Sequence, residues 1–306
     1  MNRRALTRRS LIALGTALPV LMAMPRLSLA DDAVPVMGRV HSIRLGDFQI
    51  TTLLGGSGMR DAPIQTFGLN ADPAEFEQIS HDNFVPSDRT GSSFTMTLVK
   101  TPDALVLFDA GIEAAMTRAA LAEAGHAPED VTHVVLTHMH GDHVGGLMEG
   151  DSPTFPNAEL IVPRLENDHW AANPNDAYTA KVAPLIGAAR LIGDGEQVLP
   201  GITAEAAYGH TPGHTTYLLE SQGQRLLVSG DSFNHYVYSV QRPDWHVRFD
   251  TDQQAGAATR QRVLARLADE RLPFVGYHMP FPALGFIART GDTTFRFVPA
   301  SYQFDG

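Results

Sequence analysis

The segment Thr137–Gly146 holds three histidines and one aspartate within six residues. It reads THMHGDHVGG and follows a short apolar run at residues 131–137. Neutral imidazole and carboxylate are the ligands that zinc accepts when no thiolate is present. A buried strand that ends in a glycine-containing turn lets such side chains fold back toward one centre. The pattern therefore predicts a metal site, and its donors are His138, His140, Asp142 and His143.

Four donors in one loop cannot surround two metal ions, so further donors are expected downstream. Three segments qualify: GHTPGH at 209–214, LVSGD at 227–231 and FVGYH at 274–278. In each, a histidine or an aspartate stands where a strand meets a loop, which is where functional side chains usually lie. The segment 209–214 has two histidines, and spacing alone leaves open which one is the donor. The added candidates are His210 or His214, Asp231 and His278.

Hydrophobic patterns predict the strands and helices that must position these donors. The stretch 55–93 is rich in Gly, Pro, Asp and Ser, and it is predicted to be a long excursion with one short helix at 72–79. The expected strands are a pair at 39–54 and single strands at 95–101, 104–108, 131–137, 160–162, 217–221, 225–229 and 274–277. The expected helices lie at 113–125, 164–172 and 253–270.

The segment 253–270 has the clearest amphipathic pattern, with Val263 and Leu267 on an inner face and Arg260 on an outer, solvent-facing one. Blocks of strands with a few helices between them predict helices that cover packed sheets, in an α+β or layered α/β domain. Because no repeat or long linker is present, residues 31–306 are expected to form a single domain.

Together these motifs resemble those of the metallo-β-lactamase-fold hydrolase superfamily, over roughly residues 90–280. The phrases HTPGHTTY at 210–217 and HMPFPALGF at 278–286 are similar to those of its methyl-parathion-hydrolase-like group. The resemblance implies a four-layer αββα sandwich of the α/β (α+β) class, with two zinc ions or other divalent metals per chain. It also favours His210 over His214, since the family's ligand is normally followed by Thr-x-Gly and a second small or polar residue.

By this resemblance the seven donors divide into two triads and a bridge. The first triad is His138, His140 and His210, the second is Asp142, His143 and His278, and the bridge is Asp231. The resemblance makes Asp142 and Asp231 the candidate catalytic carboxylates, with Asp109 and His214 as supporting residues. A hydroxide between the metals would attack an ester-type bond, in a lactone, a carboxylic ester or an organophosphate triester.

Aromatic residues after the bridging aspartate and elsewhere are candidates for a substrate pocket, with plain core packing as the alternative for each. An aromatic wall suits a small, neutral, ester-like substrate. The candidate wall residues are Phe84, Phe233, Tyr236, Trp245 and Phe281.

Composition excludes several other classes of protein. The 306-residue chain has no cysteine, which excludes disulfide scaffolds, Cys-ligated zinc, iron–sulfur clusters and thiol nucleophiles. Its formal net charge is −11, and the first 30 residues contribute five arginines and no acid, so the remainder carries −16. A chain that acidic is repelled by nucleic acid, which is therefore not an expected partner. A homodimer is left open.

The N-terminus has the three parts of an export signal. Thr7–Ile12 contains paired arginines, an apolar run follows at 11–24, and Ser28–Ala30 offers small residues for cleavage. The paired arginines resemble the twin-arginine signal of bacteria. We therefore predict a signal at residues 1–30 and a periplasmic location. The apolar run is too short to span a bilayer, so no stable membrane span is expected after cleavage.

Two other activities on the same fold are alternatives. A metallo-β-lactamase shares export and the histidine loop, but those enzymes resemble this chain less at Asp231. A non-haem iron oxidoreductase is the second alternative, although flavin-linked di-iron members usually have Glu at the position of His140. A non-catalytic metal-binding protein would be expected to lack some of the seven donors, and none is missing here.

Overall fold

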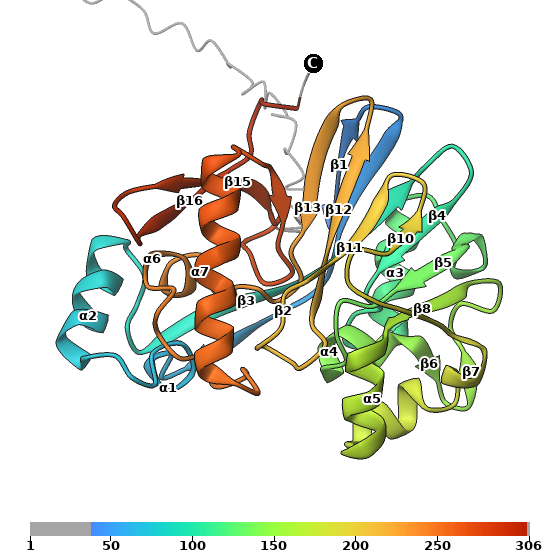
Figure 1. The fold of residues 1–306 in the computed structure, drawn as a ribbon, viewed down its shortest axis with the longest axis horizontal. Helices are drawn as coiled ribbons and strands as arrows, with labels where there is room; N and C mark the ends of the chain where they lie inside the picture. The colour runs from blue at the N-terminus through green and yellow to red at the C-terminus, as the bar shows by residue number, and fades with distance from the viewer. Residues whose placement is uncertain (1–37, 305–306) are drawn as a thin grey trace, which may run out of the picture. The chain divides into compact units, whose positions relative to one another are not determined.

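The computed structural model describes residues 38–304, which form two seven-stranded β-sheets flanked by helices (Figure 1). The predicted export signal lies outside these residues. In spatial order the first sheet contains β1 (Val40–Leu45), β2 (Phe48–Asp61), β3 (Arg89–Lys100), β4 (Leu105–Phe108), β5 (His133–Val135), β8 (Glu159–Pro163) and β9 (Arg190–Ile192). The second contains β10 (Gln197–Leu199), β11 (Ile202–Ala206), β12 (Thr215–Ser221), β13 (Gln224–Val228), β14 (Phe274–Val275), β15 (Leu284–Arg289) and β16 (Phe295–Pro299). Strands β6 (Met148–Glu149) and β7 (Ser152–Pro153) form a small separate ribbon.

Strand direction brings the loops that carry the donors together. Strands β4, β5, β8 and β9 are parallel to one another, whereas β1 to β4 are antiparallel. In the second sheet, β13 and β14 are parallel as well. Because the carboxyl ends of parallel strands meet at one sheet edge, the loops after β5, β13 and β14 can contribute to a common site.

Apolar side chains on both faces of the first sheet form the core. On β4, Val106 and Phe108 belong to the cluster shared with the second sheet, where the ring of Phe108 lies 5.1 Å from that of Tyr217. Leu105 and Leu107 belong to the outer cluster, which includes helix α3. Burial on both faces explains why β4 is a continuous apolar run rather than an alternating one.

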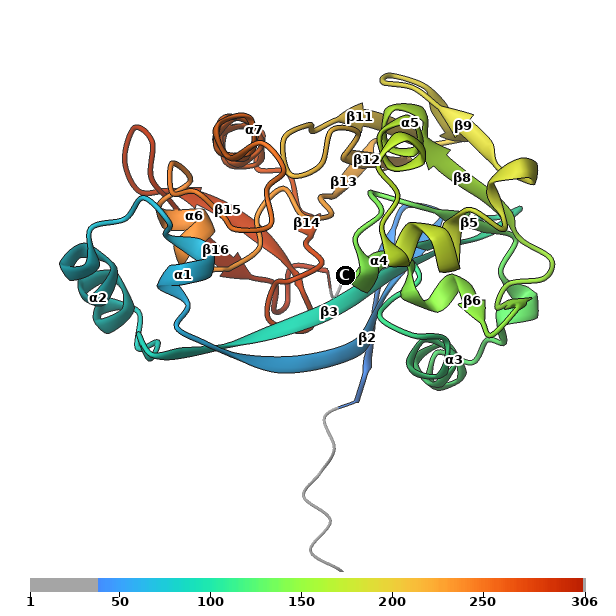
Figure 2. The same cartoon turned by 90° about the horizontal axis from the view of Figure 1, so that it is seen from below.

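Helices cover the outer faces of both sheets, with α3 against the first sheet and α7 against the second (Figure 2). The helices are α1 (Ile64–Phe67), α2 (Pro73–Asp82), α3 (Ala114–Glu123), α4 (Gly141–Val144), α5 (Arg164–Ala172), α6 (Tyr238–Gln241) and α7 (Gln253–Asp269). The predicted four-layer αββα arrangement is confirmed. Within residues 38–304, no helix has the length and apolar character needed to cross a membrane.

Two sequence predictions about elements are wrong. The two ends of the excursion predicted at 55–93 are paired strands, since β2 and β3 stay paired as far as Asp61 and Arg89. Helices α1 and α2 lie at the tip of this β-ribbon, and α2 confirms the short helix predicted at 72–79. The ribbon extends beyond the sheet and is exposed along part of its length, so its polar and glycine-rich sequence is typical of a loop. In addition, the strand predicted at 274–277 is not the last strand of the chain, because β15 and β16 follow it.

A separate aromatic core fills the space where α1 and α2 meet α6. The ring of Phe76 lies 4.2 Å from Tyr238 and 5.4 Å from Trp245. Trp245 is only 2% exposed, so its predicted role in a pocket wall is wrong and its function is packing. The same correction applies to Phe233, which is fully buried in the main core, with its ring 5.1 Å from that of Phe274.

His235 is buried beside this aromatic core, and both its ring nitrogens have partners. Its Nε2 lies 2.9 Å from Thr90 Oγ1, and its Nδ1 accepts hydrogen bonds from the backbone N–H groups of Val237 and Tyr238 at 3.1 and 3.2 Å. Burial lowers the pKa of His235 to about 3. The folded protein therefore holds this imidazole neutral.

We predict that His235 lowers the free energy of unfolding of the protein in mild acid. The unfolded chain takes up a proton near pH 6.5 and the folded chain only near pH 3, so the free energy of unfolding falls as pH drops through this window. Between pH 7.5 and 5.5 the loss from this residue is about 1.4 kcal/mol. Urea denaturation at both pH values gives the change in the free energy of unfolding between them. This change should be smaller by that amount in His235→Gln than in the parent. The exposed His81→Gln is the control, and equal slopes in all three proteins would contradict the prediction.

Candidate metal centre

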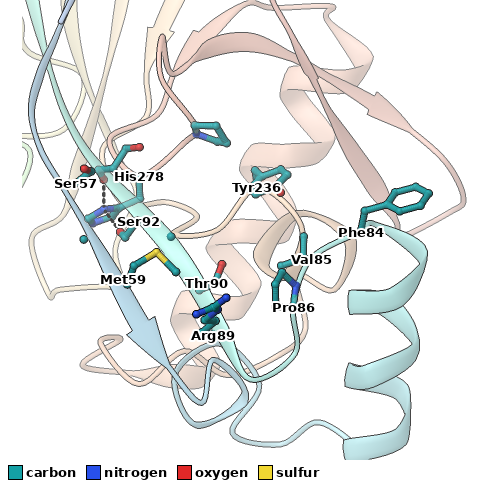
Figure 3. A pocket seen from close by; sticks show the side chains of 14 residues that line it. Ser57, Met59, Phe84, Val85, Pro86, Arg89, Thr90, Ser92, Tyr236 and His278 are labelled. Atoms are coloured by element: carbon teal, nitrogen blue, oxygen red, sulfur yellow. Dashed lines mark hydrogen bonds between the residues drawn. The ribbon is translucent and has the colours of Figure 1, made fainter. Parts of the chain in front are cut away.

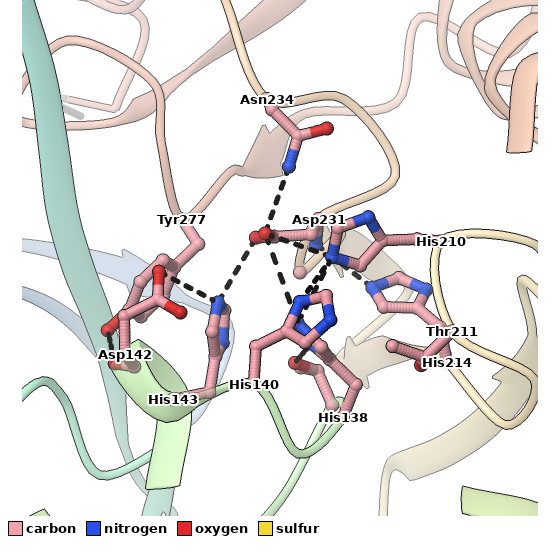
Figure 4. A network of polar contacts seen from close by, with 12 residues as sticks. His138, His140, Asp142, His143, His210, Thr211, His214, Asp231, Asn234 and Tyr277 are labelled. Atoms are coloured by element: carbon pink, nitrogen blue, oxygen red, sulfur yellow. Dashed lines mark hydrogen bonds and ion pairs between the residues drawn. The ribbon is translucent and has the colours of Figure 1, made fainter. Parts of the chain in front are cut away.

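The seven predicted donors converge in one cluster, most of which Figure 4 shows. They come from four loops that follow β5, β11, β13 and β14. Three overlapping groups have their donor atoms within 4.8 Å of one another: His138, His140 and His210; His138, His143 and Asp231; and Asp142, His143 and His278.

The first triad is a tight set of facing ring nitrogens. His138 Nε2 lies 3.1 Å from His140 Nδ1, and His210 Nε2 lies 3.2 and 3.0 Å from these two atoms. Burial, followed by the repulsion of neighbouring histidines, lowers the pKa of both His138 and His140 well below the usual value. These two neutral imidazoles, with His210 Nε2 facing them, supply converging ring nitrogens of the kind that a divalent cation requires.

The second triad is joined to the first through Asp231. His278 Nε2 lies 3.4 Å from Asp142 Oδ2 and 3.0 Å from Asp231 Oδ2. The same Asp231 oxygen lies 3.4 Å from His210 Nε2, while Asp231 Oδ1 lies 3.3 Å from His143 Nε2. The Asp231 carboxylate thus stands between the two triads, in the position that the resemblance assigns to a bridge.

Two buried atoms show that this arrangement fits cations. His143 Nδ1 is hydrogen-bonded to Asp109 Oδ2 at 2.8 Å, so in the neutral ring Nε2 carries a lone pair. His143 Nε2 and Asp231 Oδ1 face each other, and neither has a hydrogen-bond partner. Although burial opposes it, the neighbouring carboxylates of Asp231 and Asp109 raise the pKa of His143 well above its usual value, and a divalent ion would take the place of the proton that they attract. The residues therefore form a site that fits two divalent metal ions.

Asp109 braces the metal loop, as the resemblance implies. Its Oδ1 accepts a hydrogen bond from the Thr137 backbone N–H at 2.8 Å, and its Oδ2 accepts one from the Thr137 hydroxyl at 2.9 Å. The same Oδ2 binds His143 Nδ1. The Asp109 backbone is left-handed, with φ of 61°, a conformation that aspartate tolerates better than most residues. One buried carboxylate thus fixes both the start of the loop and one of its histidines.

Asp250 has the corresponding role for His210, and sequence reasoning missed it. Its Oδ1 binds His210 Nδ1 at 2.9 Å, and its Oδ2 pairs with the Arg260 guanidinium at 2.6 Å. Arg260 is 1% exposed, so its predicted place on the outer face of helix α7 is wrong. It also donates to the carbonyls of Pro243 and Trp245. Arg260 can be buried because the Asp250 carboxylate balances its charge. An arginine on a helix gives no sign in the sequence that such a partner exists.

Glu166 on α5 is a second residue that sequence reasoning missed. It is fully buried, and its carboxylate accepts four hydrogen bonds. Oε1 accepts from the Met139 backbone N–H at 2.9 Å and from the Trp170 indole at 2.7 Å. Oε2 accepts from the Thr211 hydroxyl at 2.7 Å and from the Gly213 N–H at 2.9 Å. This single side chain joins the loop of His138 and His140 to the loop of His210.

His214 is placed differently from His210, because backbone groups occupy both of its ring nitrogens. Nδ1 lies 3.1 Å from the Ala207 carbonyl, and Nε2 accepts the Asp231 backbone N–H at 2.9 Å. Burial, followed by the charge of His210, lowers the pKa of His214 to about 3. His214 therefore positions the backbone of Asp231, and His210 is the histidine of this segment whose free nitrogen faces the other donors.

Comparison with known proteins agrees with this geometry. A family model described as the metallo-beta-lactamase superfamily matches residues 90–273. The chain belongs to the metallo-β-lactamase superfamily. This confirms the predicted family. The closer likeness to its methyl-parathion-hydrolase-like group remains a prediction.

Among its relatives are N-acyl homoserine lactonases of a Bacillus species and of Bacillus cereus. The first is 34% identical over 160 residues, which cover 51% of this chain and 60% of the relative. The second is 31% identical over 109 residues, or 35% and 40% of the two chains. The chain thus spans at most 60% of the length of these two lactonases in the matched regions.

Solved structures extend the similarity to most of the chain. AidC, a dizinc quorum-quenching lactonase in complex with a product, N-hexanoyl-L-homoserine, is 26% identical with a TM-score of 0.79. The alignment covers 86% of this chain and 98% of AidC. The hydrolase AbOPH has the same TM-score at 23% identity, with 88% and 99% covered, and this shows a shared fold.

Two adjoining cavities lie beside the centre of this superfamily member. The inner cavity, of about 320 Å³, is lined by four of the donors, His140, Asp142, Asp231 and His278, and by apolar and charged side chains that include Arg60, Phe67, Phe94 and Phe249. The outer cavity, of about 550 Å³, shares Ser92 and His278 with it (Figure 3).

The remaining predicted wall residues divide between the outer cavity and the surface. Phe84 and Tyr236 line the outer cavity, where Phe84 stands 97% exposed at the end of α2 (Figure 3). Phe281 is half-buried and lines neither cavity. Sequence reasoning did not select Phe67 or Arg60, which also line the inner cavity.

We predict that His210→Ala lowers the metal content well below about two ions per chain, because one triad loses a donor nitrogen. His214→Ala, the matched control four residues away, should retain more metal, since that ring binds backbone atoms only. Elemental analysis of both variants, purified without chelator, measures this. Greater metal loss in His214→Ala would show that the donor assignment is reversed.

We further predict that Glu166→Gln raises the dissociation constant for metal by about 10- to 100-fold, as expected when a group that orients ligands is lost. The new amide N–H₂ faces hydrogen-bond donors instead of accepting from them, so the two loops separate. Competition with a chromophoric chelator gives the constant, and the melting temperature should fall as well. Glu159→Gln, which alters an exposed acid on β8, should change neither quantity.

Proposed function

We propose that this chain is a metal-dependent hydrolase that opens lactones and cleaves related carboxylic esters. The observation that carries the proposal is the inner cavity, which places the donors of both triads against an apolar wall that includes Phe67 and Phe94. The lactonases among its relatives support the choice of a cyclic ester. Organophosphate triesters, zinc as the metal in the cell and export to the periplasm stay predictions.

Each part of the site has a distinct role in this function. The two triads would hold one divalent ion each, with Asp231 between them. Ions held this way lower the pKa of water and polarise an ester carbonyl. Asn234 steadies the bridging position, since its amide N–H donates to Asp231 Oδ2 at 2.9 Å (Figure 4). The Tyr277 hydroxyl donates a hydrogen bond to the backbone carbonyl of Asp142, which fixes the backbone of this metal-binding residue.

The histidines near the site favour esters over amides. An amide nitrogen must be protonated before it leaves, whereas the oxygen of a lactone need not be. Both ring nitrogens of His214 and both of His235 are engaged with neighbouring groups. Burial is the main reason why the pKa of each histidine is lowered to about 3. Neither ring therefore carries a proton that it could donate near neutral pH. This supports lactone hydrolysis over hydrolysis of a β-lactam amide.

The outer cavity accommodates the rest of an ester substrate. Apolar side chains of Met59, Val85 and Tyr236 line it, and it meets the inner cavity at His278. An acyl or aryl group attached to the reacting ester can therefore extend away from the centre over apolar surface. This arrangement favours a small substrate that is apolar on one side of the scissile bond.

We predict that the zinc-loaded protein hydrolyses N-hexanoyl homoserine lactone and a 4-nitrophenyl ester, with a methyl-parathion-like triester and a cephalosporin tested in parallel. We expect cephalosporin turnover to be lower by about 100-fold or more, since neither His214 nor His235 carries a proton for the leaving nitrogen near neutral pH. Asp231→Ala should reduce kcat for every substrate by about 100-fold or more, which ties the activity to this site. Efficient cephalosporin hydrolysis without action on any oxygen ester would contradict the proposal.

A further inference from the structure

Arg60 brings a guanidinium group to the inner cavity without a carboxylate partner. It lies near the end of β2, is half-buried, and lines the cavity together with donors such as His140 and Asp142. Within residues 38–304, no acid lies within ion-pair distance of its side chain, and no hydrogen bond to that side chain is present. The guanidinium lies over Phe249, whose ring centre is 5.0 Å from the guanidinium carbon.

The ring that supports Arg60 is tied to the metal centre. Phe249 stands between Arg248, whose N–H donates to the Thr66 carbonyl at 2.8 Å, and Asp250, whose carboxylate binds His210 at 2.9 Å. The platform is therefore held by helix α1 on one side and by a donor histidine on the other. A cation stacked on this ring keeps a defined place relative to the reacting bond.

Stacking leaves the hydrogen-bonding edge of the guanidinium available. Its five N–H donors lie in the plane of the group, so a ring against one face does not block them. The cavity also fits two dications, whereas only two of its donors are acids, Asp142 and Asp231. A third positive group in that setting is best stabilised by an electron-rich oxygen that the ligand supplies.

We propose that Arg60 binds an acceptor oxygen, an amide carbonyl or a carboxylate, on the part of the substrate that is not hydrolysed. Arg60 then determines specificity, because esters that carry such an oxygen beside the reacting group bind better than plain alkyl esters. This inference rests on the proposed ester hydrolysis. It also refines the expectation of a small, neutral, ester-like substrate, since Arg60 would bind one polar or charged group at a fixed distance from the centre.

Three lactones of equal length test the inference: one with an alkyl side chain, one with an acylamino side chain, and one whose side chain ends in a carboxylate. Arg60→Met keeps the length and the apolar stem but removes the N–H donors. We expect kcat/KM to fall by about 10- to 100-fold for the acylamino and carboxylate lactones, mainly through KM. The alkyl lactone should change by less than about twofold.

Arg248→Met is the matched control, because it removes the same charge from an exposed position next to Phe249. The Arg248 side chain lines neither cavity. Equal losses for all three lactones in Arg60→Met, or the same selective loss in Arg248→Met, would overturn the inference.

Titration calorimetry of the zinc-loaded protein with the three ring-opened hydroxy acids gives the same comparison without turnover. Arg60→Met should weaken binding of the acylamino and carboxylate acids selectively, and unchanged dissociation constants would refute the role of Arg60. If the parent protein opens no lactone, the proposed function fails, while calorimetry still decides the role of Arg60.

Discussion

The carboxylate of Glu166 is the contact on which the metal centre depends. It is buried, and three of its four hydrogen bonds join a loop of the first sheet to a loop of the second. The approach is so close that a side chain at Gly213 would overlap the backbone of Glu166. Without this contact the two sheets could still pack through their apolar faces, but His138 and His210 would have no fixed separation. The centre is thus held by an acid that need not touch a metal.

The same device occurs three times around the cluster. Asp109 holds His143, Asp250 holds His210, and Glu166 holds the backbone of both loops. A buried carboxylate is costly unless each oxygen is fully bonded, so each of these acids restricts its neighbours to one geometry. Asp109 was found from sequence because it directly follows an apolar strand, in a motif that resembles that of the family. Glu166 lies in an ordinary helix and Asp250 in a turn, where an acid is usually exposed, so local pattern could not reveal them.

Sequence predicted best what depends on local apolar pattern and worst what depends on partners distant along the chain. Strands β4 and β13 are short apolar runs, and the donor residues at strand ends were found because each strand has a clear end. The ribbon of β2 and β3 was missed beyond residue 54, since it leaves the sheet and loses its buried face. Arg260 was placed outside because its partner Asp250 is ten residues away in a turn and its other contacts are backbone carbonyls. Such charges inside a core follow from tertiary contacts alone.

This division also separates the chemistry from the selection of substrate. The donors stand at the ends of sandwich strands, where burial on both sides fixes them. The cavity walls come mainly from the ribbon and from the segments that pack against its tip, which carry Arg60, Phe84 and Phe249. Backbone hydrogen bonds join these wall segments to one another, as between Arg248 and Thr66 and between Leu69 and His246. Because most of the wall lies outside the loops that hold the donors, side chains of the wall can change with little disturbance of the centre. In the proposed function, selectivity would therefore depend on the ribbon and the segments at its tip, while the kind of reaction would depend on the donors that the sandwich holds.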